Sequence, residues 1–131
     1  MVIDTSALLA VLLAEADAEH YAHAIEEAGT CRISAATYLE AALVIDNRGD
    51  AIASREFDLF LRRAGVIIEP VTFEQAQIAR QAYRDFGKGR HPAGLNFGDC
   101  LSYALAKSLD QPLLFKGADF TRTDIERVKP N

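Results

Sequence analysis

Short apolar runs alternate along this chain with longer stretches whose apolar residues recur at helical spacing. The short runs are typical of strands, and they lie at residues 2–3, 31–33, 66–69 and 113–115. The longer stretches predict helices, and they lie at residues 6–13, 21–28, 35–47, 51–64, 72–86 and 97–108. Such an alternation predicts an α/β sandwich built around a mainly parallel central sheet.

Residues that begin and end helices stand at the boundaries of these stretches. Ser34 and Asn96 each precede a helical stretch, and their side chains can accept hydrogen bonds from the first free backbone N–H groups. Thr72 and Gln75 have the spacing of a capping box. Gly87 ends a helix and opens the one irregular loop. These signals set the helix boundaries independently of the apolar pattern.

Length and composition fit one globular domain over residues 1–131, with 50% hydrophobic and 25% charged residues. No apolar run approaches the roughly 20 residues of a membrane-spanning helix, and the N-terminus lacks the features of a signal peptide. We therefore expect a cytoplasmic protein with no membrane contact. Cys31 and Cys100 indicate buried thiols, and His20 and His23 lack a third ligand at zinc spacing.

The net charge of −5 argues against a protein that simply coats nucleic acid. Part of this acidity follows a pattern. Asp4 directly follows the first strand, and Asp119 lies in the turn after the last one. Glu40 and Asp99 lie in or beside helices that we expect to follow strands. Because the carboxyl ends of parallel strands share one edge of the sheet, all four carboxylates could converge there.

Each acid also has an ordinary structural explanation. Asp4 can cap the next helix, Glu40 can pack its stem while its carboxylate reaches water, and Asp99 can favour a helix dipole. If the acids do converge, each pair of carboxylates repels by about 4 kcal/mol at a distance of 4 Å and an effective dielectric near 20. Such a cluster persists only if some acids are protonated or a divalent cation is bound. Oxygen ligands favour Mg²⁺ or Mn²⁺ over zinc, and such an ion suits phosphodiester hydrolysis.

A basic stretch contrasts with this acidic chain. Arg84, Lys88 and Arg90 lie in and before the irregular loop, and Lys116 follows the last strand. Such a patch suits contacts with phosphate, although a solvated helix face explains it nearly as well.

Four segments of the chain stand out together: Val2-Ile3-Asp4-Thr5-Ser6-Ala7, Tyr38-Leu39-Glu40, Asn96 to Ala106, and Leu113 to Phe120. In this order they resemble the motifs of PIN-domain ribonucleases of the VapC toxin type. The resemblance covers essentially the whole chain, and the segment NFGDCLSYALA is its most specific part. It implies a PIN-like three-layer α/β/α sandwich with a central, mainly parallel sheet.

The resemblance also implies an activity, that of a Mg²⁺-dependent endoribonuclease in which Mn²⁺ can replace Mg²⁺. The four acids at matching positions are then catalytic. Asp4 and Asp99 ligate the metal directly, and Glu40 and Asp119 complete the pocket directly or through water. The turn around Asp119 varies in the family, and Asp124 lies close enough in sequence to contribute instead.

Other roles and partners follow from the same resemblance. Thr5 or Ser6 positions a water or a phosphate oxygen, and the basic residues named above guide the RNA backbone. The chain is then the toxin of a type II toxin–antitoxin pair, forms a homodimer and is obstructed by a VapB-type antitoxin. DNA is contacted only indirectly, through that antitoxin.

Two alternatives stay open on the sequence alone. A non-catalytic, Mg²⁺-binding receiver-like module needs an acid pair near its first strand and a phosphoacceptor Asp after a central strand. Here Asp4 stands alone, the third strand ends in Glu69-Pro70, and Glu40 has no part in such a site. A PIN nuclease acting on DNA would use the same chemistry, because metal-assisted hydrolysis does not require a 2′-hydroxyl.

Overall fold

A parallel sheet lies at the centre of the molecule. The computed structural model describes residues 1–128, so the end of the domain expected over residues 1–131 lies outside the described range. The strands are β1 (Val2–Ile3), β2 (Arg32–Ser34), β3 (Ile67–Glu69) and β4 (Leu113–Leu114). They are ordered β3-β2-β1-β4, and every neighbouring pair is parallel.

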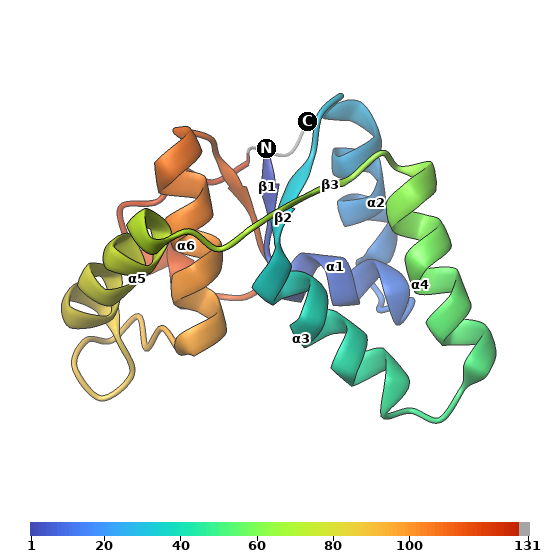
Figure 1. The fold of residues 1–131 in the computed structure, drawn as a ribbon, viewed down its shortest axis with the longest axis horizontal. Coiled ribbons are helices and arrows are strands. Elements are labelled where there is room, and N and C mark those ends of the chain that lie inside the picture. Colours follow the sequence, from blue (N-terminus) through green and yellow to red (C-terminus); the bar gives the residue numbers. More distant parts are fainter. Residues whose placement is uncertain (129–131) are drawn as a thin grey trace.

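Helices cover both faces of this sheet. Figure 1 shows α5 and α6 on one side and α1, α2 and α4 on the other, which confirms the predicted three-layer α/β/α sandwich. The helices are α1 (Thr5–Leu12), α2 (Ala18–Glu27), α3 (Ala35–Asp46), α4 (Ala51–Arg63), α5 (Phe73–Phe86) and α6 (Phe97–Leu109), with a 3₁₀ turn η1 at Asp119–Arg122. Within residues 1–128, none of these helices has the length and apolar character to cross a membrane.

Each face of the sheet has its own hydrophobic core. Consecutive strand residues point to opposite faces, so Val2 and Leu113 join the core under α5 and α6, whereas Ile3 and Leu114 join the core of α1 to α4. All four are at most 3% exposed. The short strands are therefore anchored from both sides, as expected for a parallel sheet buried between helices.

The helices begin where the capping residues predict. Ser34 accepts a hydrogen bond from the backbone of Ala36, and Thr72 accepts one from the backbone of Gln75. Asn96 and Asp99 form a reciprocal capping box at the start of α6. Local side-chain chemistry thus fixes the helix starts that position the acidic residues.

The order of the elements around Asp99 is the predicted one. The helix that carries Asp99, α6, comes after α5 and leads into β4. Because α6 runs antiparallel to the strands, its N-terminus still lies at the edge where the strands end. A buried pair of hydroxyls, Thr37 and Ser102 at 3.3 Å, joins α3 to α6 near this edge.

Candidate active site

Asp4 lies at the junction between β1 and α1. Its residue is only 3% exposed, and its carboxylate caps α1 by accepting hydrogen bonds at Oδ2 from the Ser6 backbone at 3.0 Å and from Ser6 Oγ at 2.6 Å. Asp4 therefore has the helix-capping role that the sequence allowed. Both hydrogen bonds reach the same carboxylate oxygen, Oδ2.

Glu40 projects from α3 toward the starts of α1 and α6. Its Oε1 accepts a hydrogen bond of 2.6 Å from Thr5 Oγ1, across 35 positions of sequence. Its carboxylate also packs against the backbone of Gly98 in the first turn of α6. The residue is partly buried. Glu40 is therefore held among the other helix starts and does not extend freely into solvent.

Asp99 occupies the third position of α6 and has an unusual protonation equilibrium. Its Oδ2 accepts a hydrogen bond of 3.0 Å from the Asn96 backbone N–H, which favours the charged form. Burial and, to a smaller extent, the negative charges of Asp4, Asp119 and Glu40 nevertheless raise the pKa of the Asp99 carboxyl to about 6. The other three acids therefore lie near enough to Asp99 for their charges to act on its carboxyl.

Asp119 approaches this edge from η1, after β4. The turn that carries it is tied to the β1 exit because the Lys116 backbone N–H donates to Ser6 Oγ at 3.0 Å. Asp124 points to other partners: it accepts hydrogen bonds from the Tyr103 hydroxyl at 2.6 Å and Lys107 Nζ at 3.0 Å. Asp119 thus lies near enough for its charge to act on Asp99, whereas Asp124 is engaged with α6.

The acidic edge does not form a closed set of metal ligands. Among residues 1–128, no three His, Cys, Asp or Glu side chains are close enough together to enclose a metal ion. Like charges hold such carboxylates apart until a cation or protons neutralise them. The donor set consists of carboxylate oxygens, and the charges of Asp4, Asp119 and Glu40 add to the rise that burial causes in the pKa of Asp99. These residues fit a hard divalent cation such as Mg²⁺ or Mn²⁺.

The predicted basic residues divide into two groups. Arg84, Lys88 and Arg90 line a groove of about 1030 Å³ between α5 and α6, and this groove reaches Phe97, two positions before Asp99. Lys116 lies apart from them, because its ammonium contacts Glu15 at 2.6 Å and Asp17 at 2.8 Å. These contacts raise the pKa of Lys116 and lower that of Asp17.

Two aromatic side chains stand at the same groove. Phe97 is 81% exposed although it begins α6, and Tyr83 is partly exposed on α5. The Arg90 guanidinium lies 5.7 Å from the centre of the Tyr83 ring. The groove therefore combines an apolar floor, exposed rings and positive charge next to the acidic edge.

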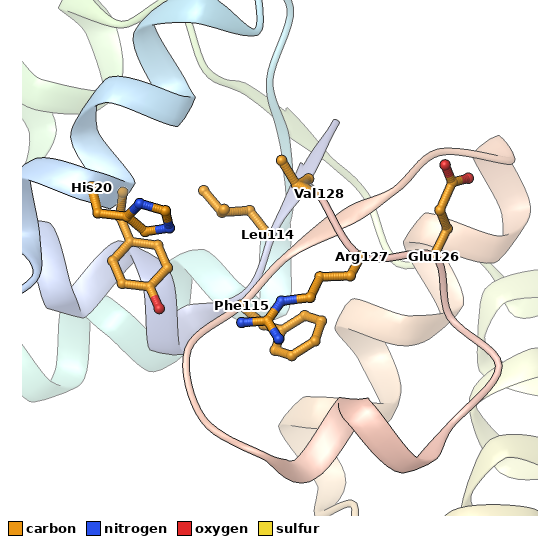
Figure 2. A pocket seen from close by; sticks show the side chains of 7 residues that line it. His20, Leu114, Phe115, Glu126, Arg127 and Val128 are labelled. Carbon is orange, nitrogen blue, oxygen red and sulfur yellow. The ribbon is translucent and has the colours of Figure 1, made fainter. Parts of the chain in front are cut away.

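A second pocket, of about 500 Å³, lies between α2 and the C-terminal segment. Figure 2 shows Leu114 and Val128 beside it, while the Glu126 side chain points away. The guanidinium of Arg127, which lines this pocket, lies 4.8 Å from the centre of the Phe115 ring. None of the four acids lines this pocket, so it is separate from the acidic edge.

Sequence reasoning missed the residues that hold the acids in place. A glycine near a helix start carries no chemistry of its own, so the residue pattern does not single out Gly98. The pattern also does not predict that Glu15 and Asp17, just beyond α1, contact Lys116. The signal for Gly98 was its placement: it is a poor helix former inside a helix and directly precedes an acid.

Comparison with known proteins agrees with this architecture. The family model "PIN domain" matches residues 1–126. The chain is 56% identical over 128 residues to ribonuclease VapC30 of Mycobacterium tuberculosis, covering 98% of both chains. It is 54% identical over 128 residues to ribonuclease VapC of Mycolicibacterium smegmatis, covering 98% of this chain and 99% of that one.

Solved structures show the same fold at low sequence identity. Mycobacterium tuberculosis VapC20, a toxin that cleaves the sarcin–ricin loop, has a TM-score of 0.74 at 19% identity, covering 98% of each chain. A toxin–antitoxin complex from Klebsiella pneumoniae has a TM-score of 0.76 at 16% identity, covering 99% of this chain and 97% of that one. From the family model and the relatives more than half identical over nearly its whole length, it follows that this chain belongs to the PIN-domain family, in the group of VapC ribonucleases.

Proposed function

We propose that this protein is a metal-dependent endoribonuclease, the toxin of a type II toxin–antitoxin pair, consisting of one PIN domain. The observation that carries the proposal is that four carboxylates lie at one sheet edge, where the charges of Asp4, Glu40 and Asp119 act on Asp99. Family membership gives this cluster its chemistry, since relatives with 52–56% identity are named as ribonucleases.

Each acid has a distinct place in the proposed site. Asp4 and Asp99 ligate Mg²⁺ directly, because each is fixed by a cap through Oδ2. Glu40 and Asp119 would complete the coordination, directly or through water. When bound, Mg²⁺, or Mn²⁺ in its place, polarises the phosphodiester and makes water a better nucleophile. The protein chain itself holds the ligands at fixed angles on rigid helix starts.

The hydroxyl groups of the site orient the acids. Thr5 donates to Glu40, and Ser6 donates to Asp4 while accepting from the Lys116 backbone. Since these hydroxyl protons are already committed to carboxylates, we propose that both residues act mainly by fixing ligands. Contact with a water or phosphate oxygen remains available through their lone pairs.

We propose that RNA enters along the groove between α5 and α6. Arg84, Lys88 and Arg90 supply the charge for its phosphates, and the exposed Phe97 ring offers a surface on which an unpaired base can stack. Lys116 is less suited to this role than the sequence suggested. Binding a phosphate there would compete with two carboxylates that already neutralise its ammonium.

The partners follow from the family. We propose a VapB-type antitoxin that obstructs the acidic edge, a homodimer, and DNA contact only through the antitoxin. A structural neighbour is itself a toxin–antitoxin complex, which supports the first of these. An enzyme acting on cellular RNA works in the cytoplasm, and we propose that location.

The test is cleavage of structured RNAs, unstructured RNAs and single-stranded DNA by the purified protein. We expect RNA cleavage with Mg²⁺ or Mn²⁺ and none with EDTA, because the carboxylates cannot act on a phosphodiester without a cation. Re-adding excess Mg²⁺ to the EDTA sample should restore cleavage. Cleavage of DNA alone would support the DNA-nuclease alternative, and cleavage that survives EDTA would contradict the metal-dependent mechanism.

Neutralising the groove should weaken RNA binding without stopping the chemistry. For Arg84→Gln combined with Arg90→Gln, we expect KM for RNA to rise about tenfold, with kcat nearly unchanged, because each phosphate contact adds to binding in a salt-dependent way. Arg63→Gln on α4 is the matched control, since it removes an exposed charge outside this groove. Equal KM values for the groove and control variants would exclude this path for RNA.

A further inference from the structure

The position of Glu40 depends on a residue that has no side chain. Gly98 lies in the first turn of α6, where a Cβ atom would come within 2.6 Å of Glu40 Cδ and Oε1, and closer still to Oε2. No ordinary van der Waals contact is that short. The Glu40 carboxylate therefore occupies the volume that any other residue at position 98 would need.

Backbone conformation does not explain this glycine. Glycines at turns of this chain, such as Gly29 and Gly117, have positive φ angles of 77° and 101° that favour glycine. Gly98 has no positive φ and lies within α6, where alanine would be the better helix former. Its conformation therefore accepts a side chain, and the three atoms that a Cβ would approach most closely all belong to the Glu40 carboxylate.

Glu40 is held between the neighbours of two other acids. Thr5, which donates to Oε1, directly follows Asp4, and Gly98 directly precedes Asp99. The hydrogen bond from Thr5 holds the carboxylate near the start of α1, and the missing side chain of Gly98 lets it approach the start of α6. The relative positions of three acids are thus set by two contacts at one carboxylate.

We infer that Gly98 is a positioning residue: the absence of a side chain there sets how closely Glu40 approaches Asp99. This inference rests on the proposed ribonuclease function. A methyl group at position 98 displaces the end of a flexible side chain and not the backbone, so the fold tolerates it. The displaced carboxylate then lies farther out, where it can no longer share a cation with Asp99.

The first test is the metal-free crystal structure and melting temperature of Gly98→Ala. We expect an unchanged or higher melting temperature, because alanine favours the helix, together with a Glu40 carboxylate displaced from α6. An undisplaced carboxylate, or a marked fall in melting temperature, would contradict the inference. This measurement needs neither metal nor RNA, so it tests the inference even if the parent protein does not cleave RNA. Failure of the parent to cleave RNA would contradict the proposed function and not the position of Glu40.

The second test is a set of variants measured on RNA with Mg²⁺. Gly98→Ala should lower kcat at least tenfold with KM within twofold of the parent, since the groove is untouched. Glu40→Asp should also lower kcat in the parent. In the Gly98→Ala background the same Glu40→Asp change should raise kcat at least threefold, because the shorter side chain fits beside the added methyl group.

This reversal of sign separates positioning from a general structural role. A merely destabilising Gly98→Ala would be made worse, not better, by a second change in the site. The inference is overturned by parent-like kcat in Gly98→Ala, or by Glu40→Asp lowering kcat in both backgrounds.

Discussion

Asp99→Asn is expected to lower the rate of RNA cleavage about 10³-fold while leaving the fold intact. Removing one proposed metal ligand takes several kcal/mol from the stabilisation of the transition state, and each 1.36 kcal/mol corresponds to a factor of ten. The substituted amide keeps an oxygen that can accept the hydrogen bond from the Asn96 backbone N–H, so the capping box at the start of α6 survives. The measurement is kcat on a cleaved RNA, with circular dichroism to establish folding.

The chain offers a matched control for this change. Asp124→Asn removes the same charge by the same chemical change, but Asp124 is exposed and bound to Tyr103 and Lys107, away from the acidic edge. We expect cleavage within about twofold of the parent, with at most a small loss of stability, since exposed ion pairs contribute about 0–1 kcal/mol. If both variants cleave alike, the assignment of the four acids is wrong.

The fold could be predicted from the sequence because its determinants are local. Strand residues such as Val2 and Ile3 form a fully apolar run. Ser34 and Asn96 predict helix starts that the structure contains. Parallel strands must place their carboxyl ends at one edge, so the convergence of Asp4 with the other acids followed from topology. The order of α5, α6 and β4 along the chain was likewise predicted from the apolar pattern.

The contacts that arrange the site could not be predicted, because they join residues distant in sequence through distances of a few ångströms. The pairing of Lys116 with Glu15 and Asp17 depends on how far the chain after α1 reaches toward the β4 exit. The approach of Glu40 to Gly98 depends on the spacing of α3 and α6. Patterns of residue type report which face of an element is buried, but they do not report these distances.

Asp99 combines two roles that the sequence presented as alternatives. It completes the capping box at the start of α6, and it has the raised pKa of a buried carboxyl near other acids. The two roles use different properties of the group, a lone pair on Oδ2 for the cap and the net charge for the cluster. Substitution by Asn therefore separates them, and its effect on stability measures the charge alone.

Without metal, Asp99→Asn should make the protein more stable than the parent at pH 7 and equally stable at pH 4. The pKa of Asp99 is about 6 in the folded state and 3.8 ordinarily. The folded state thus binds the proton more tightly, and this contribution to stability is present below about pH 4 and lost as pH rises through 6. Because Asp99 is partly exposed and solvent screens its interactions, we expect a difference of about 1–2 kcal/mol, or roughly 4–8 °C in Tm.

Saturating Mg²⁺ should reverse the order of stability at pH 7. The ion binds the ionised carboxylates of the folded parent and stabilises it by mass action, by about 2.7 kcal/mol at a concentration of 100 Kd, whereas Asp99→Asn lacks a ligand and gains little. Comparing the two proteins at each pH cancels the opposite contributions of Asp17 and Asp124, whose lowered pKa values destabilise both as pH falls. Thermal melts at pH 4 and 7, with EDTA and with Mg²⁺, provide the measurement. An unchanged difference in Tm between the two proteins under all four conditions would mean that Asp99 only supports the helix cap. A higher Tm for Asp99→Asn with EDTA at pH 7 and a lower one with Mg²⁺ would show that the charge of Asp99 binds the cation.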